Sequence, residues 1–215
     1  MKEGNCSEGA CNCEKRVLNS YERSILTERM HKMLYKRKYH SPLGEMTMIS
    51  DGKGLTALSF RGQKYDKTDE VKDTVAFSET AEEDEKTVSK INGENGASAV
   101  FAKTEEWLDI YFSECNPGFF PPLAAKGTPF QEEVWEILKT IPYGQVISYG
   151  EIARQIAEKR GIRHMSAQAV GGAVGRNPIA IIVPCHRVVG SDGNLTGYAG
   201  GLDKKEALLK LEKWL

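Results

Sequence analysis

The sequence predicts an α+β protein, in which a small N-terminal α/β domain of strands plus a helix precedes a mostly helical, winged-helix or helix-turn-helix-like C-terminal domain. Residues 41–60, SPLGEMTMISDGKGLTALSF, read as two short strands around the turn DGKG. Beyond residue 127, apolar residues recur at helical spacing, and several segments open with helix-capping residues. A chain of 215 residues is long enough to bury a core of this kind.

The composition is that of an ordinary soluble globular protein, with 40% apolar and 27% charged residues. The formal net charge is −1, so the whole chain is not a polycation. Residues 128–215 carry 11 Lys and Arg against 9 Asp and Glu, a bias that permits nucleic-acid binding without demonstrating it. No stretch approaches the roughly 18 apolar residues of a membrane span. The polar N-terminus also lacks the apolar core of a signal peptide, so we expect a cytoplasmic protein.

Residues 1–36 are predicted to form a flexible, partly helical extension. Three of the five cysteines lie in it: Cys6, Cys11 and Cys13. An odd cysteine count in a cytosolic chain argues against a disulfide framework. These thiols could bind zinc with His31 or His40, but their spacing matches none of the usual zinc patterns. Disordered tail thiols are the preferred interpretation, and no metal site is predicted.

The N-terminal domain is expected over residues 37–120. Within it, residues 66–98 hold many acidic and small polar residues, which predicts a mobile loop. The segment FAKTEEWLDIYFSE then has helical spacing. Three apolar residues fall on one face of that helix: Trp107, Ile110 and Tyr111. The segment CNPGFFPPLAAKG ends the helix and leads into the C-terminal domain, expected over residues 121–215.

The first two helices of the C-terminal domain begin at capping boxes. Thr128 and Gln131 form the first, with a proline at the first helical position. An apolar stripe follows: Phe130, Val134, Ile137, Leu138 and Ile141. Ser148 and Glu151 form the second box, which opens a helix to about Ala157.

Two more helices follow. Ser166 is predicted to cap the segment AQAVGGAVG, whose exposed face consists of small residues, and Asp203 with Glu206 to cap a last helix that ends at Trp214. A helix, a turn, a small-faced helix and a short strand are the outline of a helix-turn-helix unit. Tight packing of the small-faced helix inside a core explains the same pattern.

The segment IIVPCHRVVG, residues 181–190, carries the chemistry. A buried strand is expected to stop at Pro184, where Cys185 and His186 follow at once. A thiolate is the strongest side-chain nucleophile, and an imidazole can take the proton of a thiol whose reference pKa is about 8.5. Glu206, 20 positions after His186, is an available carboxylate to hold the imidazolium. The alternative is a buried structural cysteine beside a surface histidine.

The spacing of this pair limits the chemistry further. Adjacent residues of an extended chain point to opposite sides, so Cys185 and His186 need a turn or a bridging water to exchange a proton. A cysteine protease normally places its histidine far away in the sequence, which counts against a thiol hydrolase.

The motif and its flanks resemble the O6-alkylguanine-DNA alkyltransferases, also called methylated-DNA–protein-cysteine methyltransferases. The motif PCHRVV follows SAQAVGGAVGRNPIAIIV and precedes GSDGNLTGYAGGLDKKEALL. The resemblance is specific from Gly127 to Glu212, looser from Tyr39 to Phe120, and does not cover residues 1–36. It implies a monomeric DNA-repair protein that moves an alkyl group from O6-alkylguanine, and from O4-alkylthymine, in double-stranded DNA to its own cysteine. This transfer is a single irreversible turnover that needs no cofactor.

The resemblance also implies roles for individual residues. Cys185 would accept the alkyl group, His186 and Glu206 would form its activating relay through a water, and Asn177 would brace the turn that holds the cysteine. Tyr149 would donate a hydrogen bond to the base and crowd the phosphate of the flipped nucleotide. The backbone carbonyls of Cys185 and Val188 would accept from the guanine amino group. A loop would close the base pocket: Tyr198, Ala199 and Gly200.

DNA contacts are implied for the second helix of the unit, residues 167–175, which relatives insert into the minor groove. The contacting residues would be Ala167, Gln168 and Ala169, together with Ser191. Gln168 occupies a position where the family often has an arginine that fills the place of the extruded base. An uncharged glutamine there predicts weaker DNA affinity or weaker salt dependence. A non-catalytic damage binder or winged-helix regulator and a thiol hydrolase remain the competing function classes.

Overall fold

The computed structural model describes residues 34–64, 74–76 and 92–215. Residues 1–33 of the partly helical extension, with four zinc candidates (Cys6, Cys11, Cys13 and His31), and most of the expected acidic loop lie outside the described residues. The loop expected over residues 66–98 is wrong at two places, because a strand covers residues 74–76 and a helix begins at residue 92. Among the described helices, none is long and apolar enough to cross a membrane.

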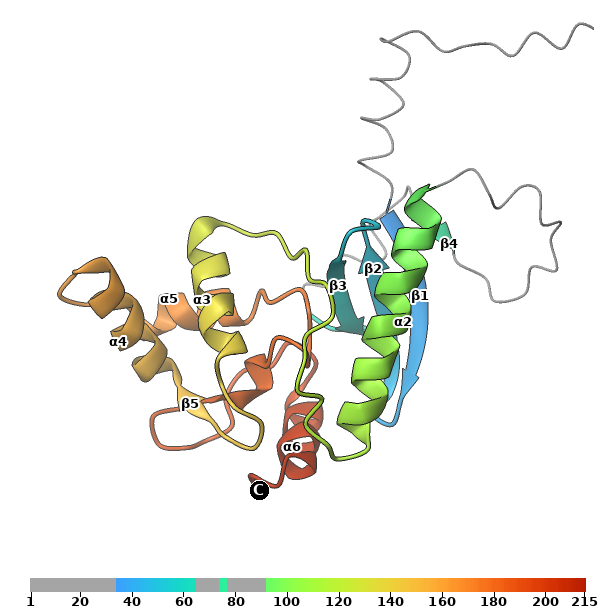
Figure 1. The fold of residues 1–215 in the computed structure, drawn as a ribbon. Helices are drawn as coiled ribbons and strands as arrows, with labels where there is room; N and C mark the ends of the chain where they lie inside the picture. The colour runs from blue at the N-terminus through green and yellow to red at the C-terminus, as the bar shows by residue number, and fades with distance from the viewer. Residues whose placement is uncertain (1–33, 65–73, 77–91) are drawn as a thin grey trace, which may run out of the picture. The chain divides into compact units, whose positions relative to one another are not determined.

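The N-terminal domain is built on a four-stranded sheet in the order β3-β2-β1-β4 (Figure 1). Its strands are β1 (Leu34–Ser41), β2 (Gly44–Ser50), β3 (Leu55–Phe60) and β4 (Thr74–Ala76). The predicted hairpin around DGKG is β2 paired antiparallel with β3, whereas β4 pairs parallel with β1. Strand β1 was not predicted, and it begins inside the expected extension. Its sequence LYKRKYHS contains four basic side chains and buries only Tyr35, so it lacks the apolar alternation of a recognisable strand.

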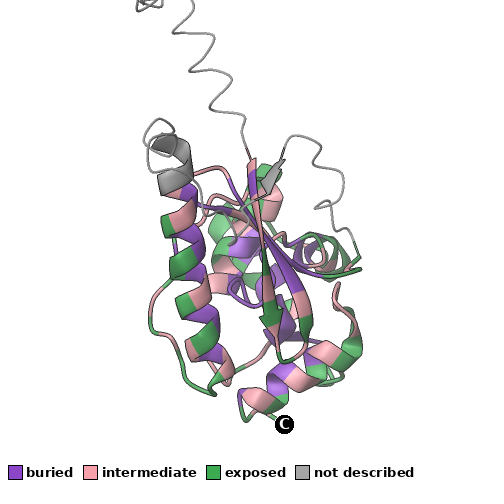
Figure 2. Ribbon diagram, turned by 90° about the vertical axis from the view of Figure 1, so that its right-hand side faces the viewer, coloured by how far each residue is buried: buried purple, intermediate pink, exposed green. Residues whose placement is uncertain are grey.

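Helix α2 (Asn92–Phe112) packs against strands β1, β2 and β3 of this sheet. Figure 2 shows the buried side of the helix turned towards the strands. Of the predicted apolar face, Trp107 and Tyr111 are buried, while Ile110 is only partly covered. The buried stripe also includes Phe101, Thr104 and Leu108, which continue the helical spacing. The last turn of α2 therefore carries Tyr111 into the interior.

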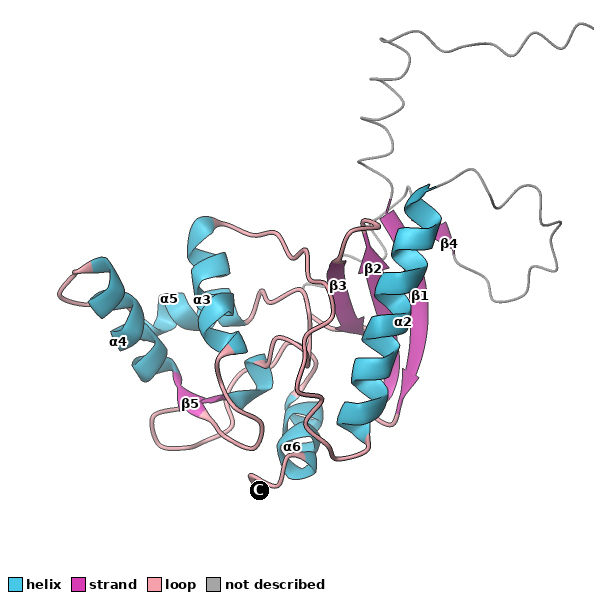
Figure 3. Ribbon diagram, viewed as in Figure 1, coloured by secondary structure: helices cyan, strands magenta, loops and turns pink. Residues whose placement is uncertain are grey.

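The C-terminal domain is mostly helical, as expected (Figure 3). Its helices are α3 (Pro129–Lys139), α4 (Tyr149–Arg160), α5 (Ala167–Val174) and α6 (Leu202–Leu211). The side chains of Thr128, Ser148 and Ser166 accept hydrogen bonds from the first turns of α3, α4 and α5, which confirms the predicted caps. Helix α4 runs to Arg160, three residues beyond the prediction, because the left-handed Gly161 is what ends it.

The predicted cap of the last helix is wrong. Gly201 is the residue before α6, and no side chain caps the helix, so Asp203 and Glu206 lie within its first turns. The helix ends at Leu211 rather than at Trp214. Glu212, the C-cap of this helix, is buried, whereas Glu206 within the helix is exposed.

The chain before Cys185 is buried, but it is not the predicted strand. Ile179 makes a single β-bridge to Leu58, and the backbone then turns, with Ile181 at a φ of +66°. The backbone N–H of Cys185 donates to the Val183 carbonyl across 2.8 Å, which a straight strand could not do. A short 3-10 helix, η2 (Cys185–Arg187), follows, and β6 (Val188–Val189) pairs parallel with β5 (Ile147–Ser148). The turn required by adjacent Cys185 and His186 is therefore present.

The cap of α4 supplies a test of the fold. The hydroxyl of Ser148 accepts from the Glu151 backbone N–H across 3.1 Å, and the Glu151 carboxylate accepts from the Ser148 backbone N–H across 2.8 Å. Ser148→Ala should lower the free energy of unfolding by about 1 kcal/mol, because one end of the capping box is lost. Urea titration followed by circular dichroism measures this change. Ser148→Thr keeps the hydroxyl and should lose much less, and equal losses in both variants would contradict the capping role.

Candidate functional site

Cys185 lies at the start of η2 with its thiol inside the fold, and the residue is only 6% exposed. The side-chain amide of Asn177 donates towards Sγ across 3.2 Å and to the Val183 carbonyl across 2.7 Å. Its carbonyl oxygen accepts from the Ile179 backbone N–H across 3.0 Å. One buried asparagine thus ties the segment before the turn to the thiol, so the structure brings Asn177 and Cys185 together as predicted.

The environment of Cys185 favours a neutral thiol at rest. Burial raises the pKa of Cys185, because a thiolate loses its hydration in the interior. The Asn177 hydrogen bond, the charge of Lys205 and the backbone N–H groups of Cys185 and His186 act in the opposite direction. These groups stabilise a thiolate once it forms, although they do not overcome burial in the resting state.

His186, the residue after Cys185, is fully buried, and its Nε2 lies 2.8 Å from Oε1 of Glu212. Burial lowers the pKa of His186 more than the hydrogen bond and charge of Glu212 raise it, so the ring is neutral at neutral pH. A carboxylate can only accept, so the proton of the neutral ring sits on Nε2. The other nitrogen, Nδ1, has no hydrogen-bond partner among the described residues and keeps its lone pair. The ring can therefore act as a base through Nδ1.

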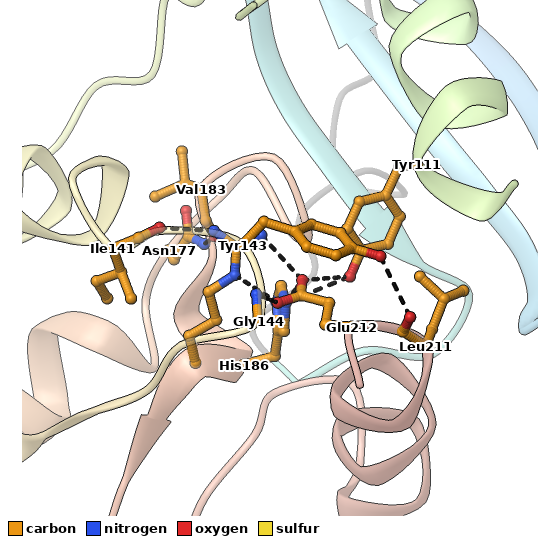
Figure 4. Close-up of polar contacts among 10 residues, drawn as sticks. Tyr111, Ile141, Tyr143, Gly144, Asn177, Val183, His186, Leu211 and Glu212 are labelled. Atoms are coloured by element: carbon orange, nitrogen blue, oxygen red, sulfur yellow. Dashed lines mark hydrogen bonds and ion pairs between the residues drawn. The ribbon is translucent and has the colours of Figure 1, made fainter. Parts of the chain in front are cut away.

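The carboxylate of Glu212 collects five hydrogen bonds, an arrangement here called the Glu212 cluster (Figure 4). Arg187 donates two of them, from Nε across 2.8 Å and from Nη2 across 2.9 Å. Tyr111, His186 and the Gly144 backbone N–H supply the others. Burial alone would raise the pKa of Glu212, but the hydrogen bonds and charges of His186 and Arg187 lower it to about 2. Glu212 is therefore a carboxylate behind the imidazole at neutral pH, and the positive charge of Arg187 is paired with it.

The assignment of Glu206 as the relay carboxylate is corrected by this geometry. Glu206 is exposed and pairs with Lys210 across 2.6 Å on the outer face of α6. The inward face of the last helical segment has the spacing i, i+3, i+4, i+7: Lys205, Leu208, Leu209 and Glu212. Availability along the chain favours Glu206, whereas this periodicity predicts Glu212.

Lys205 is a second buried residue that the sequence interpretation missed. It is fully buried, and its Nζ donates to the backbone carbonyls of Val188 across 2.6 Å and Thr196 across 2.8 Å. It forms no ion pair with a carboxylate in the part of the chain that the structure describes. Burial lowers the pKa of Lys205 to about 8, and the charge of Cys185 counteracts this. A charged residue on the apolar face of a predicted helix is the signal that could have identified it.

The predicted base-pocket loop lies beside the same turn. The hydroxyl of Tyr149, at the start of α4, donates to the Thr196 carbonyl across 3.1 Å. The hydroxyl oxygen of Tyr198 is buried without a hydrogen-bond partner among the described residues, and burial together with the charge of Cys185 raises its pKa. The Ala199 carbonyl accepts from the Lys64 backbone N–H across 2.9 Å. A side chain at Gly200 would reach 2.8 Å from the Tyr198 ring, so only glycine fits there.

The predicted DNA contacts all lie at the surface. Ala167, Gln168 and Ala169 are exposed in the first turn of α5, and Ser191 is exposed in the turn after β6. Opposite them, Val170, Ala173 and Val174 are buried. Both interpretations of the small residues of α5 therefore apply. One face of the helix packs inside the domain, and the opposite face is exposed and accessible to a partner. As for metals, no cluster of three or more possible ligands occurs among the described residues, and His40 is an exposed residue of β1.

Comparison with known proteins gives the same family over both domains. Residues 34–116 match the family described as 6-O-methylguanine DNA methyltransferase, ribonuclease-like domain, and residues 129–214 match its DNA binding domain. A methylated-DNA–protein-cysteine methyltransferase of Mycobacterium tuberculosis is 41% identical over 183 residues, which are 84% of this chain and 93% of that protein. One of Methanosarcina acetivorans is 42% identical over 179 residues, or 83% of this chain and 98% of that protein.

Solved structures agree with these matches. The crystal structure of the Mycobacterium tuberculosis O6-methylguanine methyltransferase has a TM-score of 0.65 and 40% identity, covering 84% of this chain and 93% of that one. The Mycobacterium tuberculosis protein OGT in complex with DNA has the same TM-score and identity, and the match covers 83% of this chain and 92% of that one.

The two carboxylates of the last helical segment give a paired test. Glu212→Gln should destabilise the protein by about 3 kcal/mol at pH 7, because Arg187 would be left buried without its counter-ion. The folded pKa of Glu212 is about 2 and its ordinary value is 4.5. The stabilisation is therefore complete above pH ~4.5 and disappears as the pH falls towards 2, so the deficit of the variant should shrink over that range.

Urea unfolding at pH 7 and at steps down to pH 3 measures both effects. The matched change Glu206→Gln alters an exposed residue and should cost less than about 0.5 kcal/mol at either pH. A Glu206 variant as unstable as the Glu212 variant would show that the inward face of α6 is wrongly assigned.

Proposed function

The chain belongs to the 6-O-methylguanine DNA methyltransferase family, and we propose that it repairs DNA by moving the alkyl group of O6-alkylguanine to Sγ of Cys185. One observation carries this assignment of the acceptor. A buried thiol, braced by Asn177, is followed in the same short helical turn by a neutral imidazole whose Nε2 is fixed on a buried carboxylate. That combination activates a thiol without exposing it to solvent.

The first step is removal of the thiol proton. His186 accepts it at Nδ1, directly or through a water, and becomes an imidazolium. Glu212 stabilises that imidazolium through the 2.8 Å contact at Nε2. The thiolate that remains accepts from Asn177 and from backbone N–H groups. In this role Glu212 replaces Glu206.

The second step is displacement at the alkyl carbon. The sulfur electron pair forms the S–C bond while the C–O bond to guanine breaks, and guanine leaves with the electron pair of that bond. A hydrogen bond from neutral Tyr149 stabilises the leaving base. The base then takes up one proton, and the His186 imidazolium releases the one it took from the thiol, so the overall proton balance is zero. Burial raises the pKa of Tyr149, so its phenol stays a donor. The product is a thioether without an easy leaving group, so each molecule acts once.

The base pocket is assigned to backbone carbonyls and to the loop after residue 195. The carbonyls of Cys185 and Val188 are the proposed acceptors for the guanine amino group. Each already accepts one hydrogen bond, from the Val188 N–H and from Lys205 respectively. Because a carbonyl oxygen has two lone pairs, each can take a second. The buried hydroxyl of Tyr198, with Ala199 and Gly200, closes the other side.

Lys205 has a positioning role in this proposal. Its two hydrogen bonds connect the Thr196 carbonyl, in the loop after residue 195, to the Val188 carbonyl, in the strand that follows η2. Its positive charge also lowers the pKa of Cys185 against the effect of burial. The residue thus holds the pocket together and favours the thiolate that the first step creates.

Reaching a base inside a duplex requires that the nucleotide be rotated out. We assign that task to α5, placed in the minor groove, with Gln168 filling the space of the extruded base. Its neighbours Ala167 and Ala169 permit close approach, and Ser191 contacts the backbone of the DNA. The exposure of all four side chains and the solved complex of a relative with DNA support this assignment. Repair of O4-alkylthymine, a monomeric state and a cytoplasmic location stay predictions.

The acceptor assignment predicts a separation of chemistry from binding. Cys185→Ala should abolish transfer from duplex DNA carrying labelled O6-methylguanine, because the other described thiol, Cys115, is exposed at the surface, while DNA affinity stays within about twofold. Label on the protein after denaturing electrophoresis measures transfer, and a gel-shift titration measures binding.

The same labelled DNA separates the function classes. Label moves to the protein for a transferase, stays on the DNA for a damage binder, and appears in solution for a thiol hydrolase. Transfer of label to another cysteine in the Cys185→Ala variant would contradict the assignment of Cys185 as the alkyl acceptor.

The wedge assignment predicts a substrate-dependent effect of Gln168. Gln168→Ala should slow repair of a duplex and leave reaction with free O6-methylguanine nearly unchanged, because only the duplex requires unstacking, which costs a few kcal/mol. Gln168→Arg should tighten duplex binding and steepen its salt dependence by up to about one unit of slope if the cation meets a phosphate. Single-turnover rates on both substrates measure the first effect. Equal slowing on both substrates would show that Gln168 contributes to the base pocket or to the stability of the fold, and not to base extrusion.

A further inference from the structure

We propose that Tyr111, a residue of the N-terminal domain, is a positioning residue for alkyl transfer that sets the proton position and basicity of His186 through Glu212. This inference rests on the proposed function, since it concerns the base of the same reaction. It assigns to helix α2 a direct part in a site whose other polar members come from the C-terminal domain.

The first ground is the position of the phenol. The Tyr111 hydroxyl donates to Glu212 Oε1 across 2.7 Å, from 101 residues earlier in the chain. The same oxygen accepts a hydrogen bond from His186 Nε2 across 2.8 Å. Figure 4 shows the phenol and the imidazole converging on this carboxylate from different elements. Tyr111 and His186 therefore donate hydrogen bonds to the same oxygen atom of Glu212.

The second ground is that the phenol cannot move away or ionise. The Tyr111 ring is fully buried and stacks on Trp107 with the ring centroids 5.2 Å apart. It also meets the edges of the Tyr143 and His186 rings. Burial, then the charge and hydrogen bond of Glu212, raise the pKa of Tyr111 well above its ordinary value. The hydroxyl therefore remains a donor at neutral pH.

The third ground is the direction in which the phenol oxygen presents its lone pairs. With its hydrogen directed at Glu212, the Tyr111 oxygen faces His186 Nε2 across 3.4 Å. Nε2 therefore faces two oxygens, one on the carboxylate and one on the phenol, and both can accept from it. This arrangement keeps the proton of the neutral ring on Nε2 and leaves Nδ1 free for the thiol proton.

The two contacts of the phenol act on the pKa of His186 in opposite directions, and the 2.7 Å hydrogen bond to Glu212 outweighs the 3.4 Å contact with Nε2. The charges of Arg187 and Lys205, which lower the pKa of His186, are the same with and without the hydroxyl. A hydrogen bond from Tyr111 stabilises the carboxylate charge and so weakens its attraction for the imidazolium at the same oxygen. Removing the hydroxyl should raise the pKa of His186. A hydrogen bond worth about 1 kcal/mol corresponds to a shift of roughly 0.5–1 unit. The acidic limb of the pH profile of transfer, where His186 becomes protonated and stops acting as a base, should move upward by that amount.

The test compares Tyr111→Phe with Tyr143→Phe in the full chain. Both lose one phenol oxygen from the same region, but the Tyr143 hydroxyl donates to the Leu211 backbone carbonyl across 3.2 Å and not to the carboxylate. Single-turnover transfer from duplex DNA carrying O6-methylguanine is measured from pH 5 to 9. The expected result is an acidic limb that moves upward only in Tyr111→Phe. A limb that stays, moves downward, or moves equally in both variants overturns the proposal.

A second variant covers the case in which Tyr111→Phe does not fold. Incorporation of 3-fluorotyrosine at Tyr111 keeps the hydroxyl and makes it a stronger donor to Glu212, so the acidic limb should move downward. An unchanged or raised limb would overturn the proposal independently. If the wild-type chain transfers no label, the proposed function itself fails. If the wild type transfers and the limb does not respond to Tyr111, only this inference fails.

Discussion

The buried charge of Glu212 is the constraint around which the site is organised. An isolated carboxylate in a protein interior is far less stable than one in water, so the fold must surround it with donors. Five hydrogen bonds do so, and they come from α2, from the loop after α3 and from η2. Loss of any one of these hydrogen bonds leaves the buried charge incompletely paired, which lowers the stability of the folded protein. The carboxylate therefore connects the end of α6 both to η2 and to helix α2 of the N-terminal domain.

This arrangement explains how a buried thiol can be both protected and reactive. Burial raises the pKa of Cys185 and lowers that of His186, so both groups are neutral at rest. The neutral pair is stable away from solvent, and a thiol in this form resists adventitious oxidation and alkylation. Once the proton moves, the charges that appear meet groups that are already oriented. Glu212 faces the imidazolium, while Asn177, backbone N–H groups and Lys205 favour the thiolate. A protein that reacts only once benefits from low thiol reactivity until the alkylated base is bound.

The sequence predicted the local parts of this structure and missed the long-range ones. The helix caps at Thr128, Ser148 and Ser166 were predictable because a cap involves residues only three apart. The proximity of Asn177 to Cys185 followed from a family resemblance. The assignment of Glu206 fails because availability along the chain says nothing about the direction of a side chain, whereas the spacing of Lys205, Leu208 and Leu209 fixes the inward face. No local pattern predicts the contact of Tyr111 with Glu212 across 101 residues.

The state of the His186 ring tests the central claim most directly. Nitrogen NMR of the ¹⁵N-labelled protein reports which ring nitrogen carries the proton, and comparison with His186→Gln identifies its signals among the 4 histidines. At pH 7 we predict a neutral ring with the proton on Nε2 and a bare Nδ1, becoming an imidazolium only below its ordinary pKa. A ring protonated on Nδ1, or an imidazolium at pH 7, would contradict the account.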